Sequence, residues 1–219
     1  MRWILDRSLT LTMLGLFAIF AAGQALTGWQ AHNADLVEHG QMAMTLRSYL
    51  SAGHFWEAIF ENWESEFLQM WAFVTFTTVL YQVGSPESRR PGVVEPVDAD
   101  PRRFTHLADA PWPVRRGGWV LVVYEHSLGL ALLMLFLVSW VGHALGGWTH
   151  YRVEETLHGR PAPALVEYLA SSRFWFESFQ NWQSEFLSVA AMIWLSVYLR
   201  QRWSPESKPV HAAHTETGR

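Results

Sequence analysis

Two copies of one short polar motif hold the residues whose types best suit chemistry. Each copy places an amide, a hydroxyl and a carboxylate close together, just before an apolar run. Paired carboxylates with amide oxygens suit a hard cation, a shared proton or an amine substrate. We therefore treat the two copies as one candidate polar site. Its members are Asn62, Ser65, Glu66, Asn181, Ser184 and Glu185.

The lengths of the apolar runs suggest how deep these carboxylates lie. Residues 186–199 are uncharged, and a helix of that length spans about 21 Å, roughly 9 Å less than a bilayer core. The helix must then extend back to include Glu185, and an ionisable group at that depth is by default a functional candidate. A structural alternative remains open. In it, Ser caps the N-terminus of the span, the helix dipole stabilises the Glu carboxylate there, and Asn forms a hydrogen bond with a neighbouring helix.

The histidines suggest no cofactor site. His126 and His143 belong to the third apolar segment and the other three have none, so bis-histidine haem ligation is excluded for this chain alone. His39 and His158 each precede a glycine, which is typical of a helix terminus. Without cysteine there is no thiolate zinc site or iron–sulfur cluster, and the motifs of zinc proteases, serine hydrolases and P-loop enzymes are missing. We expect no catalytic residue, no metal and no cofactor.

Four apolar segments must position these residues. The uncharged runs 8–29 and 127–149 are long enough to cross a bilayer, and the shorter runs 67–83 and 186–199 follow them. The net charge is −4, which gives no basic surplus for a phosphate backbone and argues against nucleic-acid binding. The composition predicts an integral membrane protein.

An internal repeat relates the four segments in pairs. Shifting the sequence by 119 residues aligns 8–88 with 127–207 without a gap, and about two in five positions are identical. Each repeat carries two spans, so both repeats insert in the same direction. Aromatic residues three or four positions apart, among them Trp56 and Trp63, form a stripe along one helix face. They predict an interfacial helix before the second span of each repeat. Gly142 and Gly146 lie four apart and predict the close approach of another helix.

Six of the 13 tryptophans form repeat-related pairs on one expected side of the membrane, where amphipathic rings lie at the headgroup level. These interfacial aromatics are Trp29, Trp148, Trp56, Trp175, Trp63 and Trp182.

The distribution of arginine predicts the orientation. Arginine is frequent at the N-terminus, in the middle connection 84–119 and in the tail, and scarcer in the other two connections. By the positive-inside rule, both termini and the middle connection are cytoplasmic. That connection is rich in proline and charge without apolar periodicity, so we expect it to be disordered.

The run from Phe179 to Leu187 resembles the signature of a bacterial family of small membrane proteins classed as a domain of unknown function. The shared features are Asn-Trp-Gln-Ser-Glu-Phe, a following span, and a small-Ser-Pro-x-Ser exit, matched by Gly84 and the residues after it. The first repeat departs from this pattern at Glu64, and the second at Trp203. The resemblance implies a four-span bacterial membrane protein and carries no activity.

These observations predict an all-α fold, an integral membrane four-helix bundle built from two parallel tandem repeats. Each repeat has two transmembrane helices plus an interfacial helix. The expected parts are a first repeat 1–88 with spans 8–29 and 66–83, a linker 89–118, a second repeat 119–207 with spans 120–148 and 182–200, and a disordered tail 208–219.

The leading functional hypothesis is a non-enzymatic accessory or scaffold protein of the bacterial inner membrane. It would contact lipid and assemble with itself or with a membrane protein partner. The alternative is a small proton- or cation-coupled transporter or channel that uses Glu66 and Glu185 as a pair. A membrane enzyme with a bound metal is a third possibility.

Overall fold

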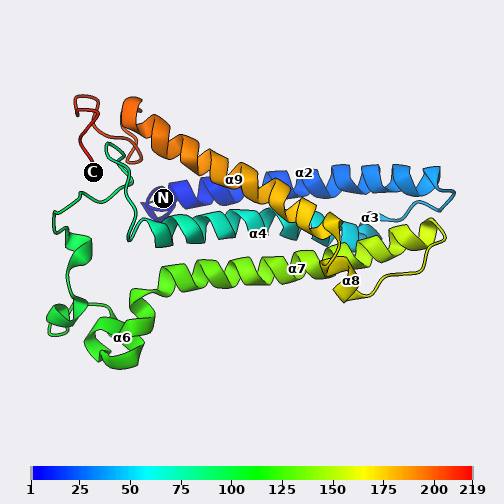
Figure 1. Cartoon of the computed structure of the whole chain (residues 1–219), viewed down its shortest axis with the longest axis horizontal. Coiled ribbons are helices and arrows are strands. Elements are labelled where there is room, and N and C mark those ends of the chain that lie inside the picture. Colours follow the sequence, from blue (N-terminus) through cyan, green and yellow to red (C-terminus); the bar gives the residue numbers. More distant parts are fainter. Residues whose placement is uncertain (1, 219) are drawn as a thin grey trace. The chain divides into compact units, whose positions relative to one another are not determined.

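The computed structural model describes residues 2–218, and every regular element among them is helical (Figure 1). In chain order these elements are α1 (Arg2–Leu5), α2 (Ser8–Glu38), α3 (Leu46–Tyr49), α4 (Gly53–Phe76), η1 (Pro96–Asp98), η2 (Pro101–Phe104), α5 (Trp112–Arg116), α6 (Gly118–Glu125), α7 (Ser127–Leu157), α8 (Leu165–Leu169) and α9 (Ser172–Tyr198). The predicted all-α class is therefore confirmed.

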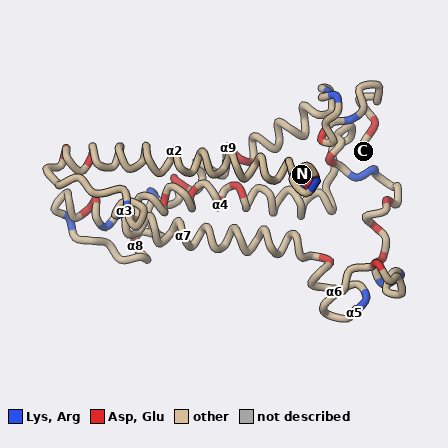
Figure 2. The backbone as a smooth tube through the Cα atoms, turned by 180° about the vertical axis from the view of Figure 1, so that it is seen from behind, with Lys and Arg blue, Asp and Glu red and all other residues tan. Residues whose placement is uncertain are grey.

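Two of the described helices, α2 and α7, are long and apolar enough to cross a membrane. Along α2 there is no charged residue before Asp35, so most of the helix is tan in Figure 2. Its most apolar stretch buries no residue within the protein, whereas the corresponding stretch of α7 is partly buried. The predicted spans at 66–83 and 182–200 do not meet the same test of length and hydropathy.

Helix α4 differs from the second predicted span at both ends. It begins at Gly53, so the predicted interfacial stretch and the start of the span form one continuous helix. It ends at Phe76, seven residues before the predicted end at 83. The hydroxyls of Thr77 and Thr78 donate to the carbonyls of Val74 and Thr75. These bonds lie at the end of α4, where its last carbonyls have no partner within the helix.

The third predicted span, 120–148, is divided into α6 and α7 at His126. Ser127 Oγ donates to the Tyr124 carbonyl across this break. Helix α9 ends at Tyr198, close to the predicted end at 200. The Arg200 guanidinium there donates to the carbonyls of Ser196 and Val197, which satisfies acceptors that the end of a helix leaves unpaired.

The connection between the repeats contains three short helical elements, η1, η2 and α5, each with proline in its first turn. The tail has defined contacts as well, because Lys208 Nζ donates to the carbonyls of Ala213, His214 and Glu216. The disorder expected for 89–118 and 208–219 stays a prediction.

The chain divides into two compact packing units. The first unit comprises residues 1–61 and 140–175, and the second comprises 62–139 and 176–219. Each unit therefore takes segments from both sequence repeats. The core of the first unit is formed by Ala144, Tyr168 and Phe174, all buried.

Local contacts in the first unit recur at the 119-residue spacing of the repeat. Trp29 Nε1 donates to the Met44 carbonyl at 2.7 Å, and Trp148 Nε1 donates to the Pro163 carbonyl at 2.9 Å. Helices α2 and α7 also begin and end at equivalent positions. The matched residues of the two repeats thus fold alike locally.

Candidate metal centre

Three histidines from three helices meet in the first packing unit. They are His32 of α2, His54 of α4 and His150 of α7, and each offers one ring nitrogen within 4.8 Å of the others. Imidazole nitrogen is a common ligand for zinc, copper, iron and nickel. All three candidate ligands are therefore of one type, imidazole nitrogen.

The helix ends place these side chains together. His32 lies near the C-terminal end of α2, His54 in the first turn of α4, and His150 in the last turns of α7. Two acidic residues share faces with them, because Asp35 is three residues after His32 and Glu57 three after His54.

Glycines let α4 approach α7 closely at this site. A Cβ on Gly146 would lie 2.7 Å from the backbone nitrogen of Glu57, and one on Gly142 would lie 2.5 Å from the ring of Phe60. The predicted close approach at these two glycines is therefore confirmed. A Cβ on Gly53 would lie 2.7 Å from the backbone nitrogen of His150, so all three positions exclude a side chain.

The spacing of the rings suits one bound ion. The ring centroids of His54 lie 4.8 Å from those of both His32 and His150, and the latter two are 6.2 Å apart. Two imidazoles on one tetrahedral ion, with metal–nitrogen distances of about 2 Å, have centroids about 5 Å apart. The centroid distances therefore bracket the spacing that a tetrahedral site needs. Coordination also requires the stacked rings of His32 and His54, whose planes are 27° apart, to turn so that both lone pairs meet one ion.

Hydrogen bonds orient two of the three rings. Nδ1 of His150 donates to the Glu57 carboxylate, which leaves Nε2 as the lone-pair nitrogen. Nδ1 of His54 lies 3.1 Å from the Tyr49 hydroxyl, and Nε2 becomes the lone-pair nitrogen when that hydroxyl accepts. Metal-binding histidines usually have such partners on their second nitrogen, where they fix the tautomer and the ring orientation.

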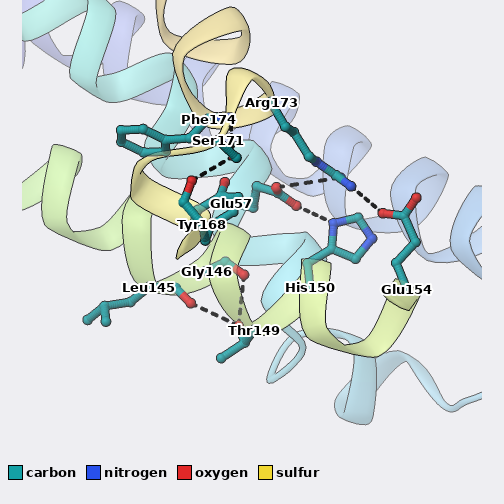
Figure 3. A network of polar contacts seen from close by, with 10 residues as sticks. All are labelled: Glu57, Leu145, Gly146, Thr149, His150, Glu154, Tyr168, Ser171, Arg173 and Phe174. Atoms are coloured by element: carbon teal, nitrogen blue, oxygen red, sulfur yellow. Dashed lines mark hydrogen bonds and ion pairs between the residues drawn. The ribbon is translucent and has the colours of Figure 1, made fainter. Parts of the chain in front are cut away.

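The carboxylate of Glu57 is itself held in a polar network (Figure 3). Its side chain is only 8% exposed, and Arg173 of α9 forms an ion pair with it at 4.0 Å. Arg173 also donates to Glu154, so one guanidinium links two carboxylates. A buried carboxylate without such partners would be costly, and the network supplies these partners to Glu57.

Burial keeps the central histidine neutral. The pKa of His54 is lowered to about 4, mainly by desolvation and further by the nearby His150 and His32 rings. Its imidazole therefore carries a lone pair at neutral pH, which is the form that binds a metal.

The three histidines line a cavity of about 480 Å³ that is open to solvent on one side. Asp35, Glu154 and Arg173 also line it, together with a second pair of histidines, His39 and His158. The cavity therefore combines five imidazoles with two carboxylates and one guanidinium. This composition suits a transition-metal ion much better than an apolar ligand.

The polar site predicted from the sequence lies in the second packing unit. Glu66 is exposed and Glu185 half-buried, and the two are near enough for their charges to interact. The Ser65 and Ser184 hydroxyls each donate to the carbonyl three residues earlier, which belongs to Asn62 and Asn181 respectively. These serine bonds are local to each helix, and whether the carboxylates form one site stays a prediction.

The six predicted interfacial tryptophans differ in their partners. Trp175 Nε1 donates to the Leu169 carbonyl, and Trp56 stacks on Phe60 with centroids 5.4 Å apart. Trp182 Nε1 instead donates to the carboxylate of Glu64, a residue with no exposed surface. The depth of these rings in a bilayer stays a prediction.

Sequence reasoning missed the three histidines because it looked for histidine ligands within the four apolar segments, and His32, His54 and His150 all lie outside them. At the equivalent positions of the other repeat, His32 aligns with Tyr151, His54 with Arg173 and His150 with Ala31. The signal lies within each helix. A histidine is followed by an acidic residue three or four positions later on α2, α4 and α7, and the three short patterns become one site only through packing.

Comparison with known proteins identifies the family. A family model described as a domain of unknown function, DUF6766, matches residues 1–219. No curated protein and no solved structure matches the chain. Because the family model covers the whole sequence, the protein belongs to the DUF6766 family.

Proposed function

We propose that this chain is an integral membrane protein that binds a divalent transition-metal ion, with His32, His54 and His150 as ligands. The observation that carries the proposal is the convergence of three ring nitrogens within 4.8 Å at the ends of three helices. Three neutral imidazoles leave the fourth position of a tetrahedral ion for water or a fourth ligand.

The membrane part of the proposal rests on α2 and α7. A helix with a long uncharged stretch that buries no residue within the protein needs an apolar environment around it, and lipid provides one. Two of the proposed ligands, His32 and His150, lie near the C-terminal ends of α2 and α7, and each of these ends leads into an arginine-poor connection. By the positive-inside rule this is the non-cytoplasmic side, so the ion would enter from outside the cytoplasm.

The function that follows is metal binding by a membrane-anchored protein, in agreement with the accessory role expected from the sequence. The site is built from helix ends and local hydrogen bonds of this chain alone. Assembly with a second copy or with another membrane protein is compatible with the site and is not needed to complete it.

The experiment is a Zn²⁺ titration of the full-length protein in detergent, with a chromogenic chelator as competitor. We expect one tightly bound ion, and we expect His54→Ala to weaken it by more than the roughly 10–100-fold typical of an outer-sphere change. His106→Ala is the matched control, because His106 is an exposed histidine far from the three ligands in sequence. Equal affinity in both variants, or no binding by the unsubstituted protein, would contradict the proposal.

A second candidate function is proton- or cation-coupled transport through Glu66 and Glu185. The mutual electrostatic interaction of these two carboxylates favours it. The test is uptake into liposomes that hold the full chain. Glu66→Gln with Glu185→Gln should abolish uptake while leaving Zn²⁺ affinity at His54 unchanged, and uptake by the double variant at the original rate would refute it.

A further inference from the structure

A second pair of histidines faces the same cavity as the three proposed ligands. His39 follows the last residue of α2 and His158 follows the last residue of α7, and both rings are exposed. The two positions are equivalent in the sequence repeat, and the structure brings their ring centroids to 5.5 Å. Two imidazoles that share one tetrahedral ion have centroids about 5 Å apart.

Both rings use Nδ1 for a hydrogen bond within their own helix end. Nδ1 of His39 donates to the Asp35 carbonyl at 2.9 Å, and Nδ1 of His158 donates to the Glu154 carbonyl at 2.8 Å. Each bond satisfies a carbonyl at the end of a helix, in keeping with the helix-terminus role expected from the sequence. When an imidazole that donates from Nδ1 is neutral, its Nε2 carries the lone pair.

The cavity connects the two groups of histidines. Its lining includes His39 and His158 as well as His32, His54 and His150. Six waters of a hydrated divalent ion occupy about 180 Å³ at ~30 Å³ each, so the cavity of about 480 Å³ admits the ion with its water. The carboxylate of Asp35, which is 58% exposed, lies 3.5 Å from Nδ1 of His39 and adds negative charge that attracts cations.

We propose that His39 and His158 form an outer metal site that captures an incoming divalent ion and delivers it to the inner site at His32, His54 and His150. This proposal rests on the proposed function, since delivery requires the inner site. Two exposed imidazoles, with solvent in the remaining positions, bind an ion more weakly than three imidazoles of which one is buried and two are half-buried. The ion therefore moves inward toward the site of higher affinity. Its bonds to His39 and His158 break, bonds to His32, His54 and His150 form, and coordinated water is released.

The test compares stoichiometry and loading rate in the full-length protein. The outer variant is His39→Ala with His158→Ala, the inner variant is His54→Ala, and His106→Ala is the control. Equilibrium dialysis with Zn²⁺ gives the number of bound ions, and rapid mixing with limiting Zn²⁺ gives the rate at which the inner site fills.

We expect the unsubstituted protein to bind two ions, one of them at least tenfold more weakly. The outer variant should lose the weaker ion, keep the affinity of the tighter one and fill the inner site several-fold more slowly. The single variant His158→Ala should show the same changes to a smaller extent. Near-ultraviolet circular dichroism, to which the many tryptophans contribute, confirms that each variant keeps its packing.

The outcomes separate the two proposals. If the outer variant binds as many ions as the unsubstituted protein, or fills the inner site at the same rate, the outer site is refuted while the inner site stands. If His54→Ala leaves the tighter ion unaffected, the proposed function itself is wrong.

Discussion

At the scale of single residues, the properties of the site depend on what the second nitrogen of each histidine contacts. His150 donates to a buried carboxylate, which increases the electron density of its ring and fixes the direction of Nε2. Tyr49 is buried and its hydroxyl lies beside His54. These partners orient the rings before any ion arrives, so little side-chain entropy is lost on binding.

The first prediction concerns Glu57. We expect Glu57→Gln to weaken Zn²⁺ binding by about 10–100-fold, because a neutral amide accepts a weaker hydrogen bond from His150 and contributes no charge. The dissociation constant is measured by chelator competition. Glu155→Gln is the control, since Glu155 pairs with Arg160 and does not line the cavity. An unchanged constant in Glu57→Gln would mean that this contact has no part in metal binding.

At the scale of elements, close helix packing holds the side chains of the candidate metal centre in position. Glu57 can reach His150 only because α7 presents glycines where α4 crosses it. A similar arrangement occurs where Gly28 leaves room for the Tyr49 hydroxyl, since a Cβ there would lie 2.4 Å from its oxygen. At these positions within helices, glycine leaves the space that the neighbouring Glu57 backbone and Tyr49 hydroxyl occupy, and no turn requires it.

The second prediction tests this packing. We expect Gly146→Ala to lower the free energy of unfolding by about 1–3 kcal/mol, because the new methyl group overlaps the Glu57 backbone. Gly23→Ala is the matched control, as nothing lies within 4 Å of its Cβ position. The control should be neutral or more stable by up to about 1 kcal/mol, owing to the better helix propensity of alanine.

The measurement is unfolding in a denaturing detergent, followed by tryptophan fluorescence. Equal stability of the two variants would show that α4 and α7 do not need the small residue at this position.

At the scale of the whole molecule, the proposed orientation places the three histidines on one side of a membrane. The connections that follow α2 and α7 carry His39 and His158, while the arginine-rich connection between the repeats carries η1, η2 and α5. If α2 and α7 cross the bilayer, the ligand-bearing ends of both helices face the same side.

The third prediction tests the orientation. The natural chain has no cysteine, so each introduced cysteine is the sole target of a membrane-impermeant maleimide. We expect Met42→Cys to react from outside intact cells and Val94→Cys to react only after the membrane is opened. Both side chains are strongly exposed, at 91% and 86%, so burial does not limit either reaction. Labelling of both from one side would overturn the proposed orientation.

The apolar segments, the repeat and the helical class follow from the sequence because they depend on local properties. Hydropathy, charge and residue spacing are visible along the chain, and they locate α2 and α7 well. The ends of α4 were harder to predict. Uncharged residues continue beyond Phe76 to Val83, so the sequence offers no charge that marks the end of this helix.

By itself, the sequence determined the all-helical class, the two long apolar helices and the internal repeat. Only the tertiary structure assembled the candidate metal centre, because His32, His54 and His150 come from three helices and have no histidine partner at the repeat-related positions. A repeat is recognised because equivalent positions of its two copies carry the same residues. This candidate site instead uses histidines whose equivalent positions carry other residues, and only packing brings them together. The glycine contacts between α4 and α7 decide that packing, and they bring the three imidazoles to one cavity.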